Sequence, residues 1–314
     1  MGKTEENVKE ESTMKKAAAM LWKYLLGGII PTYVLTFFLM IMSSYITATI
    51  VTLPVEKLNL IHDDNPVLST GMSYLGSIGM WGAILIIYLL FRRQRAYLKK
   101  LIRKINKRTV ICLIIGLFIG VGLNITCILA AIIHKDIYLY FNDFSILPCL
   151  FLLVAVFVQS SSEEVLCRGF VYRRIETFYK MPIVPIIANS LLFAILHLLN
   201  PGVTVVSILN IFLCGILFSI LYYYTGNLSL CYTGHMGWNF CQSIIFGLPN
   251  SGVVVPYSFM KLEASNARDS FFYNCAFGVE GTEFSVIVLS IACIIVIILG
   301  QKKIINNGNK SEEN

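Results

Sequence analysis

The chain has 314 residues, of which 56% are hydrophobic and only 14% are charged, and its mean hydropathy is +0.72. These values exclude a soluble globular domain of this length. Several runs of about 20 apolar residues instead predict a polytopic helical membrane protein. The net charge of +7 does not indicate nucleic-acid binding, because the positive charge is concentrated in residues 92–108, a linker without acidic residues. The partner that the composition predicts is the lipid bilayer.

The first half of the chain contains three expected spans. A polar tail, residues 1–16, has no signal-peptide pattern. The spans follow at about 25–53, 69–91 and 109–133. The loop 54–67 carries acidic residues, so we place it outside, as we do the loop 134–145. The basic linker 92–108 predicts the cytoplasmic side, where it would lie as an amphipathic helix on the membrane surface.

Five further spans are expected after residue 145. They run at about 146–174, 185–200, 203–224, 228–246 and 284–300, with a long external loop at 247–282. Each cluster of positive charge then falls on one side, so the pattern predicts a multi-pass protein of the cell membrane with both termini cytoplasmic. The expected fold class is all-α, a bundle of about eight transmembrane helices. It divides into a tail (1–16), N-terminal helices with the basic linker (17–145), a core (146–300) and a polar C-terminal tail (301–314).

The nine cysteines predict neither disulfides nor a zinc site. Most of them lie in apolar runs, and none forms a Cys-x-x-Cys pair. They are typical of small buried hydrophobic residues.

Ionisable residues stand inside the fourth expected span, where they cost several kcal/mol and indicate a functional site. Glu164 and Arg168 are four residues apart, share one helix face and can pair. Glu163 points about 100° away from that pair, which leaves it as a candidate proton acceptor. The alternative interpretation is a structural Glu–Arg clamp between helices.

Two histidines also lie in apolar helices. His197 follows Phe193 by four residues, so the ring can pack beneath the imidazole, and His235 shares a face with Asn239. At 1.5 Å per residue, Glu163 and both histidines lie roughly 10 to 18 Å from the inner boundary, so they can meet. Each residue alone is typical of a helix–helix hydrogen bond, but the joint pattern predicts a site.

The three motifs, Glu-Glu-x-x-x-Arg, Phe-x-x-x-His and His-x-x-x-Asn, resemble in order and spacing those of the CPBP intramembrane proteases. That family includes the type II CAAX prenyl endopeptidases and bacterial proteins once grouped as abortive-infection (Abi) or bacteriocin-immunity proteins. The resemblance covers about Leu147 to Phe246, and Gly278–Gly281 is similar to a weaker family element. It implies an eight-helix membrane bundle that hydrolyses a peptide bond in a membrane-anchored peptide or protein, with a prenylated C-terminus as one precedent.

The resemblance also implies a catalytic set, which comprises Glu163, Glu164, His197, His235 and Asn239, supported by Arg168 and Phe193. In this set the first glutamate and His197 would activate a water molecule. The second glutamate would pair with Arg168, while His235 and Asn239 would stabilise the oxyanion.

The role of metal stays open at this point. Glu163, His197 and His235 are the residues that would hold one Zn²⁺ with an open fourth position. The family is widely labelled as metalloproteases, and a metal-free glutamate mechanism is equally compatible with the sequence.

Two other functions compete with the protease. One is a non-catalytic membrane protein, an immunity or scaffold protein that keeps the motif residues for packing. The other is a small transporter with the carboxylates and histidines as a proton relay, which the lack of paired halves in the sequence disfavours. Oligomeric state and substrate identity are not predicted.

Overall fold

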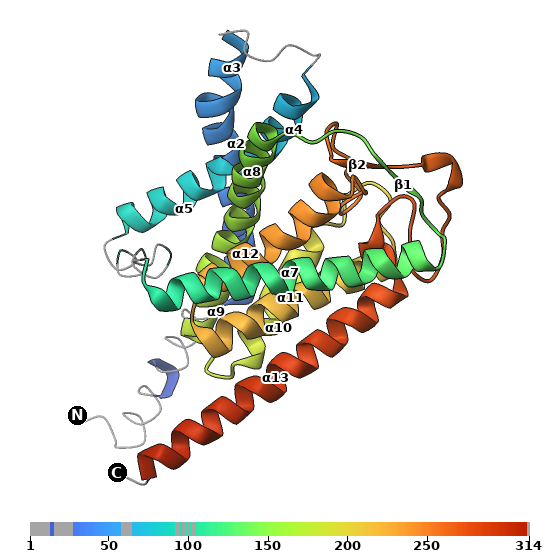
Figure 1. The fold of residues 1–314 in the computed structure, drawn as a ribbon. Coiled ribbons are helices and arrows are strands. Elements are labelled where there is room, and N and C mark those ends of the chain that lie inside the picture. Colours follow the sequence, from blue (N-terminus) through green and yellow to red (C-terminus); the bar gives the residue numbers. More distant parts are fainter. Residues whose placement is uncertain are drawn as a thin grey trace, which may run out of the picture.

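The computed structural model describes residues 13–15, 28–57, 65–91, 95, 98, 101 and 105–312. Within these ranges the chain is a bundle of helices with one small two-stranded antiparallel sheet (Figure 1). The predicted tail 1–16 and the predicted amphipathic helix in the linker fall almost entirely outside the described residues.

The α-helices, in chain order, are α2 (Ile29–Thr47), α3 (Leu53–Lys57), α4 (Pro66–Leu75), α5 (Ile78–Leu90), α7 (Lys107–Ile133), α8 (Ile146–Glu164), α9 (Arg173–Phe178), α10 (Ile183–Leu196), α11 (Val205–Thr225), α12 (Leu228–Asn239) and α13 (Glu283–Glu312). Three π-helical segments continue helices: η1 (Ala48–Thr52), η2 (Val165–Tyr172) and η3 (Phe240–Ile245). Two short 3₁₀ turns, η4 (Ala264–Asn266) and η5 (Val279–Gly281), lie in the loop before α13.

Six helical stretches in the described part of the chain are long and apolar enough to cross a membrane: Ile29–Val55, Pro66–Leu90, Lys107–Ile133, Ile146–Phe178, Val205–Thr225 and Glu283–Lys302. The predicted all-α membrane bundle is therefore confirmed. The count of eight is not, because the other two expected spans form shorter helices. α10 has 14 residues, and α12 has 12 before it continues as η3.

The fifth predicted helix extends further toward the C-terminus than the helix in the structure. The prediction carried it to Asn200, whereas α10 ends at Leu196 and His197 is its C-cap residue. A turn at Leu198–Gly202 then leads to the Thr204 capping box that starts α11. The loss of helical geometry before Pro201 agrees with the restriction that proline places on the residues preceding it.

The long loop 247–282 contains structure that the sequence did not predict. Strand β2 (Met260–Leu262) pairs antiparallel with β1 (Leu139–Phe141), which joins this loop to the loop after α7. The two loops are also joined by Asp136, which accepts hydrogen bonds from Arg268 Nε (2.8 Å) and Ser270 Oγ (2.5 Å). Together these contacts hold the loop over one end of the bundle.

The close packing of α12 on α7 sets the position of the third motif, His-x-x-x-Asn, in the fold. At Gly116 and Gly120 of α7 a Cβ atom would lie only 2.2 Å from Leu230 O and 1.9 Å from Gly234 O. Small residues let two membrane helices approach this closely. The approach fixes α12 between α7 and α8 and so brings its polar residues toward the acidic pair of α8.

All nine cysteines are free thiols, and of the nine only Cys275 is exposed. The prediction of buried thiols is confirmed for six of them, whereas Cys149 and Cys214 are partly buried.

Candidate active site

The helix that carries the acidic motif changes geometry within the motif, and the helix that carries the His/Asn motif changes geometry directly after it. η2 begins at Val165, one residue after Glu164, and η3 begins at Phe240, one residue after Asn239. π-Helical segments are rare, and they occur frequently at functional sites. The two motifs therefore sit at the points where the regular hydrogen-bond ladder of α8 and α12 is interrupted.

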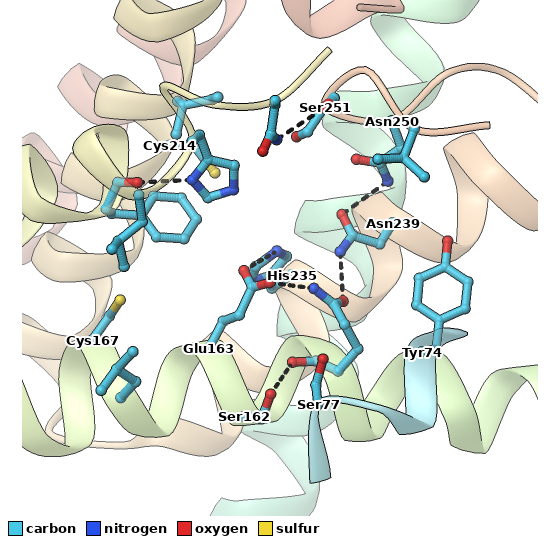
Figure 2. A pocket seen from close by; sticks show the side chains of 18 of the residues that line it. Tyr74, Ser77, Ser162, Glu163, Cys167, Cys214, His235, Asn239, Asn250 and Ser251 are labelled. Carbon is cyan, nitrogen blue, oxygen red and sulfur yellow. Dashed lines mark hydrogen bonds and ion pairs between the residues drawn. The ribbon is translucent and has the colours of Figure 1, made fainter. Parts of the chain in front are cut away.

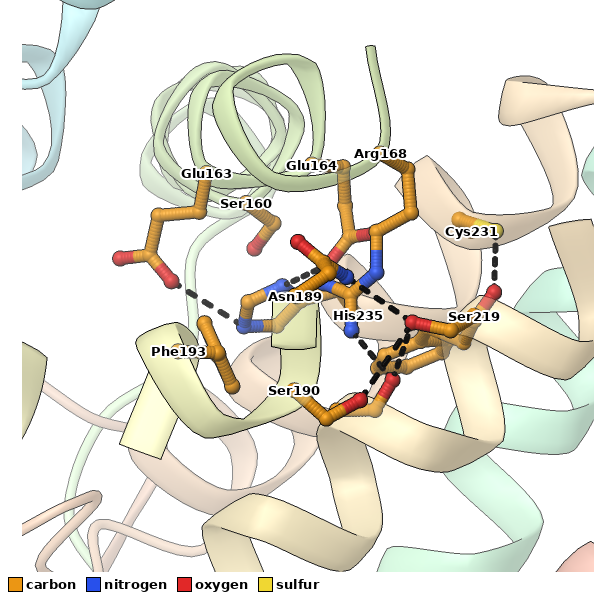
Figure 3. A network of polar contacts seen from close by, with 12 residues as sticks. Ser160, Glu163, Glu164, Arg168, Asn189, Ser190, Phe193, Ser219, Cys231 and His235 are labelled. Carbon is orange, nitrogen blue, oxygen red and sulfur yellow. Dashed lines mark hydrogen bonds and ion pairs between the residues drawn. The ribbon is translucent and has the colours of Figure 1, made fainter. Parts of the chain in front are cut away.

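The imidazole of His235 lies between the two adjacent glutamates (Figure 3). Its Nδ1 is 3.0 Å from Glu164 Oε1, and its Nε2 is 3.7 Å from Glu163 Oε2. Because an ionised carboxylate only accepts hydrogen bonds, the contact with Glu164 places a proton on Nδ1. Nε2 then faces Glu163 across a gap slightly longer than a hydrogen bond.

The predicted ion pair between Glu164 and Arg168 is present, and both side chains are fully buried. Arg168 Nη1 donates to Glu164 Oε1 at 2.8 Å, and Nη2 donates to the carbonyl of Gly215 on α11 at 2.7 Å. The guanidinium carbon lies 5.3 Å and 5.6 Å from the ring centroids of Phe193 and Phe218. Arg168 thus clamps α8 to α11, as the structural interpretation expected, and the same pair also holds the imidazole of α12.

His197 caps α10 with its own side chain. Nδ1 lies 2.8 Å from the carbonyl oxygen of Phe193 in the last turn, so Nδ1 carries a proton and Nε2 is its free nitrogen. The centroid of the Phe193 ring lies 4.7 Å from that of the His197 ring, as the predicted packing requires, and 6.1 Å from that of the His235 ring, in a T-shaped arrangement. Phe193 is therefore the apolar contact shared by the two imidazoles.

Asn239 faces a residue that the sequence did not single out. Its Nδ2 donates to Gln159 Oε1 at 3.0 Å and to Ser160 Oγ at 3.3 Å. Gln159 Nε2 in turn donates to Glu163 Oε1 at 2.5 Å. The sequence could have indicated Gln159, because it stands four residues before Glu163 and therefore lies on the same helix face.

A cavity of about 520 Å³ joins these residues, and its lining includes Glu163, His197, His235 and Asn239. Glu164 and Arg168 lie behind this wall. Figure 2 shows Glu163 and His235 in the middle, with Cys167 and Cys214 on one side and Tyr74 and Asn250 on the other. The lining thus combines apolar and thiol side chains with hydroxyl and amide groups.

Part of the cavity wall comes from outside the three motifs. α2, α4 and the short turn before α5 contribute Ser43, Ser44, Ser73, Tyr74 and Ser77. The loop before α13 contributes Asn250, Ser251 and Glu280, the last of which belongs to the weaker Gly/Glu element noted in the sequence. Sequence reasoning missed the other seven, because isolated serines and loop asparagines carry no spacing that marks them.

The residues named for zinc do not fit a three-ligand centre. Among the described residues, no three His, Cys, Asp or Glu side chains gather closely enough to hold a metal ion. The Nδ1 contacts of the two histidines, with Glu164 and with a backbone carbonyl, leave Nε2 available on each ring and do not by themselves exclude a metal. Because the described residues form no three-ligand group, the mechanism proposed below contains no step through a metal.

Comparison with known families gives one match. Residues 145–241 match the Rce1-like family, described as type II CAAX prenyl endopeptidase Rce1-like. No match was found among the curated proteins. The matched segment begins at the N-cap of α8 and ends in η3, so it contains all three motifs but excludes α2 to α7, Asn250 and Glu280. This match to residues 145–241 agrees with the resemblance to the CPBP intramembrane proteases, which covered about Leu147 to Phe246.

Proposed function

We propose that the protein is an intramembrane endopeptidase that hydrolyses a peptide bond in a membrane-associated polypeptide. The observation that supports this best is the position of His235, between Glu163 in the cavity wall and Glu164 buried behind it. A proton acceptor, an oriented imidazole and room for a polypeptide then occur together. The membrane location follows from the apolar helices, and the cytoplasmic placement of both termini is part of the proposal.

In the proposed reaction Glu163 takes a proton from a water molecule that occupies the space between Glu163 and the substrate carbonyl. The water oxygen attacks the carbonyl carbon, and the carbonyl oxygen becomes an oxyanion. The proton on Glu163 then passes to the amide nitrogen as the C–N bond breaks. The products are a carboxylic acid, which ionises to a carboxylate as its proton passes to the new amine, and that amine as an ammonium group; Glu163 returns to its starting state.

The two histidines have different surroundings, which supports different roles. In its protonated form His235 donates from Nε2 to the oxyanion, while Glu164 holds Nδ1–H and keeps the ring in place. His197 presents Nε2 as its free nitrogen, and it assists Glu163 in handling the proton. Asn239 supports the oxyanion with the hydrogen of its NH₂ group that now reaches Ser160, while the other hydrogen stays on Gln159.

The substrate class in this proposal is a membrane-anchored peptide or protein, and a prenylated CAAX-type C-terminus is one candidate. The cavity supports a polypeptide better than an ion, because its volume is about 520 Å³ and amide and hydroxyl groups are among its lining.

The test uses the full chain in lipid nanodiscs with membrane-anchored peptides, both prenylated and unmodified, and mass spectrometry of the products. Glu163→Gln should lower the cleavage rate by about a hundredfold or more, because it removes the general base. Glu263→Gln, the same change at an exposed loop position, should cleave at the wild-type rate. Equal cleavage by Glu163→Gln would exclude this mechanism. A wild-type protein that cleaves nothing but still protects cells from a bacteriocin would favour the immunity alternative.

A further inference from the structure

A tight turn, residues Asn250–Val253, closes one end of the cavity. Asn250 and Val253 exchange backbone hydrogen bonds of 2.9 Å and 3.0 Å. The two residues between them have positive φ, 49° at Ser251 and 83° at Gly252. A serine rarely adopts this left-handed conformation, so contacts from the surroundings must hold the turn.

Glu280 supplies these contacts from η5. Its Oε2 accepts from the Ser251 backbone N–H at 2.7 Å and from Ser251 Oγ at 2.8 Å, and its Oε1 accepts from Trp238 Nε1 at 2.6 Å. A buried carboxylate is costly unless several donors satisfy it, as they do here. The carboxylate thus ties the turn to the α12 residue directly before Asn239.

The turn is also fixed to the segment that follows His197. Asn200 Nδ2 donates to the carbonyl of Ser251 at 2.9 Å. A Cβ at Gly252 would lie 2.0 Å from the carbonyl oxygen of Pro201, so only glycine permits this approach. The turn is therefore in contact with the ends of both histidine-bearing helices.

Held in this way, Asn250 contacts the site itself. Its Nδ2 donates to Asn239 Oδ1 at 3.2 Å. Figure 2 shows the resulting chain of contacts from Asn250 through Asn239 toward Glu163.

The orientation of every amide in this chain follows from the carboxylate at its end. Glu163 only accepts, so Gln159 must point its NH₂ group at Glu163 and its oxygen at Asn239. Asn239 must then point its NH₂ group at Gln159 and its oxygen at Asn250. Asn250 donates a hydrogen bond to that oxygen from its own NH₂ group.

We propose that Asn250 is a positioning residue of the active site, which sets the amide of Asn239 and is itself held by Glu280. This inference rests on the proposed endopeptidase function and lies outside the segment that matches the family. Asn250→Asp would place an acceptor against Asn239 Oδ1. If the side-chain amide of Asn239 flipped to avoid this clash, its oxygen would face the oxygen of Gln159. The chain of hydrogen bonds between the amides would therefore be broken in either orientation.

The experiment measures kcat and KM of the full chain in nanodiscs on a membrane-anchored peptide that the wild type cleaves. Asn250→Asp should lower kcat by roughly tenfold to a hundredfold with little change in KM, which is less than the roughly hundredfold to thousandfold loss on removing an oxyanion donor itself. Asn250→Ala, which adds no charge and serves if the aspartate does not fold, should show a smaller fall in kcat. Asn266→Asp is the matched control, since it adds the same charge at an exposed position of the same loop.

The outcomes separate the two proposals. If Glu163→Gln is inactive while Asn250→Asp and Asn250→Ala match Asn266→Asp, the endopeptidase stands and Asn250 has no positioning role. A rise in KM at constant kcat would also overturn the inference, because Asn250 would then bind substrate. If the wild type cleaves no peptide, or if Glu163→Gln is fully active, the proposed function fails and the inference fails with it.

Discussion

His235 Nδ1 lies 3.0 Å from Glu164 Oε1, so the second glutamate of the acidic motif serves two partners. The same oxygen accepts from Arg168 at 2.8 Å. A carboxylate that fixes the tautomer and orientation of an imidazole is a familiar part of hydrolytic sites. Glu164 is therefore more than the counterion of a buried arginine.

Because Glu164 serves two partners, we predict that its contribution to stability can be restored without restoring its contribution to activity. Glu164→Gln leaves the charge of Arg168 buried and uncompensated, and breaking such a pair costs about 3–5 kcal/mol. The double variant Glu164→Gln/Arg168→Met should recover much of that stability and remain inactive, because His235 has lost its carboxylate. Thermal unfolding in detergent and peptide cleavage measure the two effects. A double variant with wild-type activity would contradict the role of Glu164.

His197 can be tested without removing its cap on α10. Asn at this position keeps a donor near the place of Nδ1 and removes Nε2. His197→Asn should therefore fold like the wild type and lose about a hundredfold or more in cleavage rate. If its rate is unchanged, Nε2 of His197 takes no part in the reaction.

Gln159 is the neighbour of Glu163 that the sequence did not reveal. Gln159→Leu removes the donor to Glu163 and the acceptor of Asn239. Loss of a hydrogen bond to a charged group is worth about 1.5–3 kcal/mol, so cleavage should slow by roughly tenfold to a hundredfold. Val158→Leu, a change at the adjacent apolar position, should have little effect on the rate. Equal rates for the two variants would exclude Gln159 from the site.

The contact between α7 and α12 gives a prediction about stability. Gly120→Ala would place a methyl group 1.9 Å from the carbonyl oxygen of Gly234, which requires the helices to separate. Overpacking of this kind costs about 1–3 kcal/mol. Gly122→Ala, where a Cβ meets nothing within 4 Å, is the control on the same helix. The two variants should differ in midpoint of thermal unfolding, with Gly120→Ala lower, and equal midpoints would contradict the packing described here.

The link between the loop after α7 and the loop before α13 predicts a dependence of stability on pH. Burial acts to raise the pKa of Asp136, but hydrogen bonds from Ser270, Arg268 and His134 outweigh it and hold the pKa below its usual value of 3.8. The stabilisation is therefore present above that value and is lost as the pH falls through the lowered pKa. Asp136→Asn should lower the unfolding midpoint at about pH 7, and the difference from wild type should shrink toward about pH 3. A difference that stays constant over this range would exclude the carboxylate as its cause.

The sequence predicted those parts of the fold that depend on local pattern. Apolar length identified the helices, and the four-residue spacing of Glu164 and Arg168 predicted a pair that is present. Depth along the helices predicted that Glu163 and His235 meet, and their side chains lie 3.7 Å apart.

The parts of the fold and the site that were not predicted depend on tertiary contacts, which the spacing of residues in the sequence does not encode. The sequence assigned Glu164 to Arg168 alone, because the approach of α12 is set by glycine contacts with α7. Asn250 reaches the cavity on a turn with positive φ and Glu280 reaches it on η5, both in a loop for which the sequence predicted only an external position. The end of α10 at Leu196 changed His197 from a residue within a span to a helix cap.

A double-mutant cycle on Glu163 and His235 tests the central claim most directly, because that claim joins both side chains in one hydrolytic step. The measurement is the cleavage rate of one membrane-anchored peptide by wild type, Glu163→Gln, His235→Ala and the double variant. Groups that act as a unit are strongly non-additive, so each single variant should lose nearly as much rate as the double variant. Losses that multiply, or a single variant that cleaves at the wild-type rate, would contradict the account.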